Sequence, residues 1–422
     1  MKENPKSKLI RRDFFKKSAA GIIGFFGGGH LNVALGSQNN FKKPISPTDS
    51  NWSVINSQFI LKKGITYMNN ASLGMPPINV VDSVRSGYEK ISKEPLHGKH
   101  KLQDRINNNV MPLLAKTFNV NKEEIILTRN ASEALFLQTL GIVLKEGDEV
   151  VLSTQEHPAA LKPWVHRGSK DGVVLKYVFI PSPLVSKRDV IDRLMSAVTS
   201  KTKAISFCHV TRGGHKYPVK EIANVARRKG VATLVDGAQA VGQFPVDIKN
   251  LGCDAYSASL HKWILAPAGS GFLFVRNRSK NYFESPFDLK ASTVQSYFNP
   301  PGTKDYPVRA AVGAALNFID KIGLENIEKR CRYLSNHLKN GLKKMKDVKI
   351  LSSDNPKLSA PGSTIFEKSN LDALESVKIF EDKIGFHIDE HQRDGHNAIR
   401  VSTHFYNTTS QIDLFLATLE SI

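Results

Sequence analysis

Short runs of β-branched and apolar residues alternate along this chain with segments whose apolar residues recur at helical spacing. The short runs are typical of buried strands and occur at 125–128, 149–153, 175–180, 204–207, 232–235, 255–258 and 271–275. The helix-like segments between them span 132–144, 158–168, 188–198 and 219–229. This alternation predicts an α/β fold with a mostly parallel, seven-stranded sheet.

The pattern changes after the last of these strands. Two long helical runs, 308–322 and 325–345, precede a weaker mixture of strand-like and helix-like segments. We therefore predict a large domain over residues 52–305 and a small C-terminal α+β domain over residues 306–422. The N-terminal part of the large domain could pack on the small one.

The first 36 residues differ from the rest of the chain. Arg11 and Arg12 lie in an Ile-Arg-Arg-Asp-Phe-Phe-Lys sequence, which precedes a glycine-rich apolar run. This resembles a twin-arginine export signal over residues 1–36, followed by a polar linker over 37–51. Such a signal would pass the folded protein through the twin-arginine machinery to the periplasm. A basic amphipathic arm or a membrane anchor is the alternative.

The chain is strongly basic, with a formal net charge of +20, of which residues 1–36 contribute +5. The lysines are scattered and do not alternate with aromatic residues, so we expect a solvated basic surface and no nucleic-acid partner. Charge-driven binding of a polyanion is the alternative. No apolar run beyond residue 36 is long enough to cross a bilayer, so we expect no stable membrane insertion. Three scattered cysteines, Cys208, Cys253 and Cys331, predict neither a disulfide framework nor a metal site.

Two residues in the stretch 235–263 carry the most specific chemistry. Asp236 directly follows a predicted strand, at the edge of the sheet where open α/β folds place their ligands. Its carboxylate could hold a proton on a ring nitrogen, or it could simply cap a helix. Lys262 lies between a predicted strand and a glycine-rich turn, where a desolvated amine could bond to an aldehyde. A surface lysine is the ordinary alternative.

Three other segments suggest ligand contacts. Residues 128–134 join a strand end to a helix start, where backbone N–H groups can bind phosphate or where a side chain can cap the helix. His157 follows another strand and could stack on a planar ring or remain an exposed loop histidine. Arg400 lies in an apolar run, where it needs an anionic partner. That partner could be a substrate carboxylate or a structural acid.

The order of these motifs resembles the class V aminotransferases, which are pyridoxal-phosphate (PLP) enzymes of fold type I. The resemblance covers the chain from about residue 52 to its end and is most specific over 236–271. Within this class, 208–222, 259–276 and 399–413 are similar to the isopenicillin N epimerase and selenocysteine lyase-like group.

The resemblance implies a role for each matching residue. Lys262 would carry the cofactor covalently and, once released by substrate, move the proton at Cα. Asp236 would pair with the pyridinium nitrogen, His157 would stack on the ring, and Gln239 would approach the ring oxygen.

The same resemblance implies how the remaining groups are bound. Thr303 would reach the phosphate bound by a neighbouring subunit, which implies a homodimer, and Arg400 would bind the substrate carboxylate. The phosphate would be held within one subunit by Ala131, Ser132, Ser259 and His261.

Two departures from the family pattern bear on the reaction. The loop expected at 389–396 has no thiol, whereas cysteine desulfurases of this class need a nucleophilic cysteine there. Desulfurase or selenocysteine lyase chemistry is therefore disfavoured. Arg212 stands where desulfurase-like relatives usually have asparagine, and could stabilise the cofactor oxygen or recognise an acidic substrate.

We therefore expect an exported PLP enzyme that acts at Cα of an amino-acid-like substrate with a carboxylate. Epimerisation, transamination and elimination all begin with the same proton loss, and the sequence does not separate them. A non-catalytic binding protein that keeps the cofactor fold is the alternative from another class.

Overall fold

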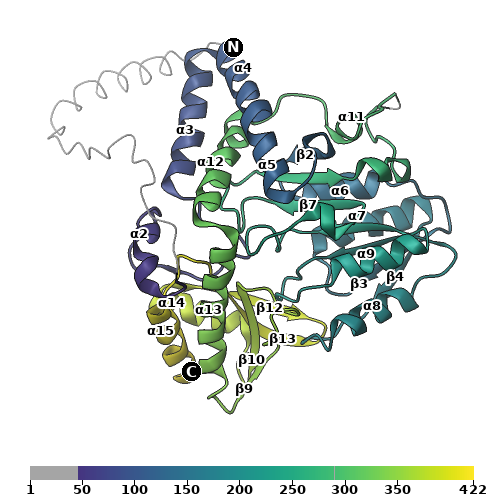
Figure 1. Ribbon diagram of the computed structural model, residues 1–422. Coiled ribbons are helices and arrows are strands. Elements are labelled where there is room, and N and C mark those ends of the chain that lie inside the picture. The colour runs from purple at the N-terminus through teal and green to yellow at the C-terminus, as the bar shows by residue number, and fades with distance from the viewer. Residues whose placement is uncertain (1–45, 289) are drawn as a thin grey trace, which may run out of the picture. The chain divides into compact units, whose positions relative to one another are not determined.

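The computed structural model describes residues 46–288 and 290–422 (Figure 1). The twin-arginine prediction lies outside these residues. The main sheet has seven strands in the order β2-β8-β7-β6-β5-β3-β4, and only β8 runs antiparallel to its neighbours. The predicted fold class is confirmed. The strands are β2 (Ile125–Thr128), β3 (Glu149–Ser153), β4 (Val174–Val178), β5 (Thr202–Cys208), β6 (Ala232–Asp236), β7 (Ala255–Ser259) and β8 (Gly271–Val275).

Both faces of this sheet are buried, which explains the near-continuous apolar runs. In β3, Val150 and Leu152 join one hydrophobic cluster, while Val151 joins another. β4 lies at the edge and is half-exposed. The connecting helices are α6 (Ala131–Gly141), α7 (Pro158–Asp171), α8 (Lys187–Ser196), α9 (Val219–Arg228) and α10 (Ile248–Leu251), with shorter turns η4 (Lys122–Glu124), η5 (Asn277–Tyr282) and α11 (Val294–Phe298).

A helical layer combines helices before the main sheet in sequence, which the strand-and-helix pattern did not predict, with α12, which matches the predicted run 308–322. Helices α3 and α12 lie side by side in this layer (Figure 1). Eleven of the seventeen residues of α12 are buried, because small side chains such as Ala310 and Ala311 allow close packing. The layer consists of α3 (Ile78–Lys93), α4 (Pro95–Arg105), the π-helical turn η3 (Ile106–Val110), α5 (Met111–Phe118) and α12 (Tyr306–Ile322).

The C-terminal part has its own four-stranded antiparallel sheet, in the order β12-β13-β10-β9. Its core includes Leu334, Phe366, Phe380 and Phe415. The short β1 pairs in parallel with β11, so an N-terminal segment joins this region. The elements are β1 (Thr66–Tyr67), α13 (Leu324–Leu342), β9 (Val348–Ile350), β10 (Ser363–Lys368), α14 (Ala373–Ile384), β11 (Phe386–His387), β12 (Asp389–Arg393), β13 (His396–Ser402) and α15 (Thr409–Glu420).

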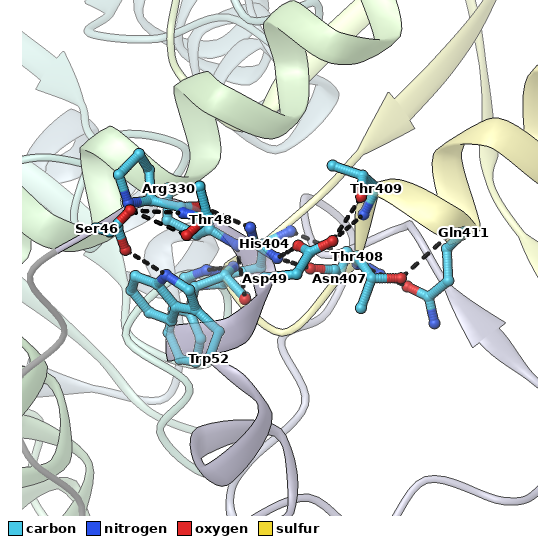
Figure 2. Close-up of polar contacts among 12 residues, drawn as sticks. Ser46, Thr48, Asp49, Trp52, Arg330, His404, Asn407, Thr408, Thr409 and Gln411 are labelled. Carbon is cyan, nitrogen blue, oxygen red and sulfur yellow. Dashed lines mark hydrogen bonds and ion pairs between the residues drawn. The ribbon is translucent and has the colours of Figure 1, made fainter.

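The first described residues are fixed to this C-terminal region by a buried arginine (Figure 2). Arg330 of α13 donates from Nη2 to Asp49 Oδ1 at 2.5 Å and from Nη1 to the carbonyl oxygen of Pro47 at 2.7 Å. Asp49 Oδ2 in turn accepts the backbone N–H of Thr409 at 3.1 Å. The turn η2 (Asp49–Asn51) and helix α2 (Ser53–Asn56) follow directly.

Within the part of the chain that the structure describes, no helix is both long and apolar enough to cross a membrane. In the same residues, no group of three or more histidine, cysteine or acidic side chains is placed to hold a metal ion.

Candidate active site

A pocket opens at the carboxyl ends of the central parallel strands, where Asp236 ends β6, Ser259 ends β7 and Cys208 ends β5. This is the edge at which parallel α/β sheets bind ligands. The structure brings nine predicted site residues together in its lining: Ala131, Ser132, His157, Arg212, Asp236, Gln239, Ser259, His261 and Lys262. Thr303 does not line this pocket and is exposed, so its role across a dimer interface stays a prediction.

The turn after β7 presents Lys262 to the pocket. Burial lowers the pKa of Lys262 to about 8, although the nearby Asp236 carboxylate opposes this, and Arg400 and Arg212 lower the pKa further. A larger fraction of the amine is therefore unprotonated near neutral pH than in an exposed lysine. The backbone of this turn is tightly packed, because a Cβ on Gly74 would lie 1.8 Å from the Lys262 carbonyl oxygen.

Asp236 is buried beside this lysine. Burial raises the pKa of Asp236, whereas a 2.9 Å hydrogen bond from the Ala238 N–H and the charge of Lys262 lower it. Only one carboxylate oxygen receives this backbone bond, which leaves capacity to accept a proton-bearing ring nitrogen. The carboxylate is therefore suited to a cationic partner within the pocket.

The first turn of α6 forms one end of the pocket. Asn130 caps the helix by accepting the Glu133 N–H at 2.9 Å, and the Ala131 N–H donates to Ser259 Oγ at 2.9 Å. The helix start thus combines backbone N–H groups with the hydroxyls of Ser132 and Ser259, a donor set that fits a phosphate. The capping role considered from the sequence is also present, and belongs to Asn130.

His157 combines two roles at the start of α7. Its Nδ1 accepts the Ala159 N–H at 3.1 Å and caps the helix, while the ring lines the pocket. Burial and the neighbouring cations Lys262, Arg393 and Arg212 lower the pKa of His157 to about 4. The imidazole is therefore neutral at physiological pH, which suits contact with a flat ring better than charge recognition.

Gln239 and His261 make defined contacts of their own. The Gln239 amide donates to the Ala71 carbonyl oxygen at 2.8 Å and accepts from Trp263 Nε1 at 2.8 Å. His261 Nδ1 lies 3.2 Å from the Ser270 carbonyl oxygen. Burial lowers the pKa of His261 as well. These bonds orient both side chains within the lining.

Two arginines and two acids form a cluster that reaches the pocket lining through Arg212. Arg212 Nη2 lies 2.7 Å from Glu390 Oε1 and 3.1 Å from Asp389 Oδ2. Arg400 is almost fully buried and pairs through Nη2 with Asp389. Arg400 acts electrostatically on both Lys262 and His157, although it does not line the pocket itself.

The prediction of a loop over 389–396 is wrong. These residues form β12, the hairpin turn and the first residue of β13. Asp394 and Gly395, both with positive φ (51° and 85°), make its two-residue turn. The turn contacts the segment before His157. Asp394 accepts from Thr154 Oγ1 at 3.1 Å, and Arg393 donates to the Glu156 carbonyl oxygen at 2.5 Å.

Sequence reasoning missed Glu156 and the pocket position of Cys208. The Cys208 thiol lies 3.0 Å from Glu156 Oε2, and burial raises the pKa of Cys208 well above its ordinary value. Burial also raises the pKa of Glu156 to about 7. The only signal in the sequence for Cys208 is its position just after the apolar run 204–207.

A sequence model of the Aminotransferase class-V family matches residues 66–415. The chain belongs to the aminotransferase class-V family. The predicted resemblance is thereby confirmed, and with it an enzyme that depends on PLP.

Named relatives in the class-V family differ in the reaction. A probable cysteine desulfurase of Synechocystis sp. is 28% identical over 384 residues, which cover 85% of this chain and 90% of the relative. Isopenicillin N epimerase of Amycolatopsis lactamdurans is 26% identical over 399 residues, which cover 88% of this chain and 98% of the relative.

A solved structure agrees with the class-V fold. It is a variant of the cystine C–S lyase C-DES with glycine covalently linked to its PLP cofactor. It has a TM-score of 0.76 and 22% identity, and the match covers 86% of this chain and 98% of that chain. At this identity the likeness supports the fold alone.

Proposed function

We propose that this class-V enzyme acts at the carbon bearing the amino group of an amino-acid-like substrate with a carboxylate, and that it is exported. One observation carries the proposal. Lys262 and Asp236 face one pocket, with the α6 N-terminus at one end and Arg212 at the substrate side. PLP, when bound, supplies an electron sink for the bond pair left on Cα after proton loss.

Lys262 is the residue best placed to move the Cα proton. Its lowered pKa leaves part of the amine free to accept a proton near pH 8. Asp236 would keep the cofactor ring nitrogen protonated, and the neutral His157 would hold the ring plane. The start of α6, with Ser132 and Ser259, would hold the phosphate.

The β12–β13 hairpin is bonded to the segment that precedes His157, a residue of the pocket lining. Its turn is bonded to residues 154–156, and its first strand supplies the acids that pair with Arg212 and Arg400. Arg400 would bind the substrate carboxylate next to the reacting carbon.

C–S bond cleavage is the second candidate, favoured by the desulfurase relative. A desulfurase passes sulfur to a reactive thiol, and all three cysteines of this chain are buried. Cys208 lines the pocket but has a raised pKa and donates to Glu156. The geometry therefore favours epimerisation, transamination or elimination without a protein persulfide.

Deuterium exchange at Cα tests the activity. Wild-type holoenzyme should label Cα of a bound amino acid, whereas Lys262→Ala should lose at least about 100-fold in exchange rate, the usual contribution of a positioned base. Lys216→Met is the matched control, since Lys216 also has a pKa lowered by burial but lies outside this pocket. Equal exchange rates in wild type and Lys262→Ala would reject the proposal.

Export and dimerisation need separate tests. Arg11→Lys together with Arg12→Lys should retain the protein in the cytoplasm, whereas Lys6→Arg with Lys8→Arg should not. Light scattering should give twice the chain mass, and Thr303→Ala should raise the dissociation constant for PLP. A monomer with unchanged cofactor affinity would reject the homodimer that the family resemblance implies.

A further inference from the structure

Four charged side chains form a closed cluster beside the substrate side of the pocket: Arg212, Asp389, Glu390 and Arg400. Asp389 lies between the two arginines, and Glu390 pairs with Arg212. The cluster has no net formal charge. An arginine pair that served only as an anion site would not need two acids of its own.

Arg400 is not fully satisfied within this cluster. Its Nη2 group donates to Asp389 and, at 3.1 Å, to Asn69 Oδ1, so both hydrogens are used. Its Nη1 reaches only the Arg212 carbonyl oxygen, at 3.5 Å. Its buried Nε has no acceptor among residues 46–288 and 290–422. A guanidinium with unused donors in a buried place is a site for a further acceptor.

A guanidinium can bind both oxygens of a carboxylate through Nη1 with Nη2 or through Nε with Nη2. Both pairs include Nη2, so a substrate carboxylate bound in this way to Arg400 must use that nitrogen. The substrate carboxylate would therefore displace the Asp389 carboxylate from Nη2 of Arg400. The displaced carboxylate cannot move far. Asp389 lies directly across the hairpin from Arg400 in the strand register, and its other oxygen accepts the Glu390 N–H at 3.0 Å. The Asp389 carboxylate would therefore stay beside Arg212, which lines the pocket.

Arg212 would then be the one arginine of the cluster left for two acids, Asp389 and Glu390, and the cluster would carry a net negative charge. About a quarter of each of the Asp389 and Glu390 side chains is exposed, and Arg212, which pairs with both acids, lines the pocket. A neutral side chain on the substrate leaves the two acids sharing Arg212, and an acidic one adds repulsion. A basic side chain restores charge balance, because it replaces the arginine that the substrate carboxylate has taken.

We propose that Asp389 and Glu390 are specificity-determining residues that select an amino acid whose side chain carries a second cationic group, an ammonium or a guanidinium. This inference rests on the proposed function, in which Arg400 binds the substrate carboxylate. It adds the side-chain class, and it favours a basic substrate over the acidic one considered for Arg212.

A matched set of ligands tests this selection. Lysine, norleucine and 2-aminoadipate share a six-carbon chain but end in a cation, a methyl group and an anion. Dissociation constants for both enantiomers come from the change in cofactor absorbance of the holoenzyme. We expect lysine to bind at least tenfold more tightly than norleucine, and norleucine more tightly than 2-aminoadipate.

Neutralising Asp389 and Glu390 should abolish this order of affinities. Asp389→Asn with Glu390→Gln should bring lysine and norleucine within about twofold of each other, since the released arginines then need no balancing cation. Glu367→Gln is the control, because Glu367 is also a partly exposed acid of the small sheet but pairs with His396 and Lys349. If the double variant does not fold, Glu390→Gln alone should still reduce the preference at least threefold.

The outcomes separate the two proposals. Norleucine or 2-aminoadipate binding as tightly as lysine, or none of the three binding, overturns the inference while leaving Lys262 as the cofactor lysine. An unchanged lysine preference in the folded acid variants also overturns it. A holoenzyme with no cofactor attached to Lys262 rejects the proposed function itself.

Discussion

Arg330 and Arg400 are both buried, with 0% and 2% of the side chain exposed, yet their surroundings differ. All three nitrogens of Arg330 have acceptors: the carbonyl oxygens of Pro47, Phe405 and Asn407, and the Asp49 carboxylate (Figure 2). Arg400 has one acid, one amide and one distant carbonyl oxygen, and its Nε has no acceptor in the described chain.

This difference separates a structural arginine from one that can bind a ligand. Satisfied donors fix the chain that supplies the acceptors, and here Arg330 holds residues 47–49 against α13 and the start of α15. Unused donors in a closed place instead favour an incoming acceptor. Substitutions at the two positions should therefore affect different measurements.

Replacing Arg330 should have the largest effect. Arg330→Ala leaves buried carbonyl groups and the Asp49 carboxylate without their partner, and should lower the free energy of unfolding by about 3–5 kcal/mol. Urea unfolding measures this loss. The remaining folded protein should keep its rate of Cα exchange, and a large loss of rate at unchanged stability would place Arg330 in the active site instead.

Replacing Arg400 should have the opposite pattern. Arg400→Gln should reduce kcat/KM at least about 100-fold, equal to about 2.7 kcal/mol of lost substrate binding in the transition state. The loss of stability should be smaller than the loss of about 3–5 kcal/mol expected for Arg330→Ala, because Asp389 keeps its 3.1 Å contact with Arg212. A destabilisation as large as that of Arg330→Ala would show that Arg400, like Arg330, is a structural residue.

The pH dependence of the Cα exchange rate should follow the titration of Lys262. Its amine must be unprotonated to accept the Cα proton, and its pKa is lowered to about 8. The exchange rate should therefore rise about tenfold between pH 7 and pH 9 and then level off. A rise that continues past pH 10 would mean that the lysine titrates as an exposed one.

Replacing Asp49 should have the smallest effect. Burial raises the pKa of Asp49, but hydrogen bonds from Thr409 and Arg330 outweigh it and lower the pKa below its usual value. The carboxylate thus contributes stability above pH 4, and the contribution fades as pH falls through the lowered pKa. Asp49→Asn should cost about 1 kcal/mol at pH 7 and less at pH 3. A constant difference across this range would exclude the ionic contribution.

The sequence predicted best where burial acts on both faces of a strand. The strand runs at 125–128 and 271–275 coincide with β2 and β8, because a fully buried strand must be apolar throughout. Asp236 was identifiable for the same reason, since a carboxylate directly after such a run is at the ligand-binding edge.

The hairpin could not be predicted this way. Asp389, Glu390 and Arg393 show no apolar alternation, because their partners are charged or polar groups far away in the sequence. Gln392 bonds to Asn397 within the hairpin. The Asp389–Arg400 pair depends on the register of β12 against β13, which a two-residue turn sets. Helices α3 and α4 were not predicted because each contains only one buried apolar side chain besides a glycine, Val80 in α3 and Leu102 in α4.

The central claim is that Lys262 is the residue that bears the cofactor. Reduction of the yellow holoenzyme with borohydride, followed by peptide mass spectrometry, tests it directly. We expect a single pyridoxyl group on the peptide containing Lys262, and its absence in Lys262→Ala. A colourless protein, or a label on a different lysine, would contradict the account.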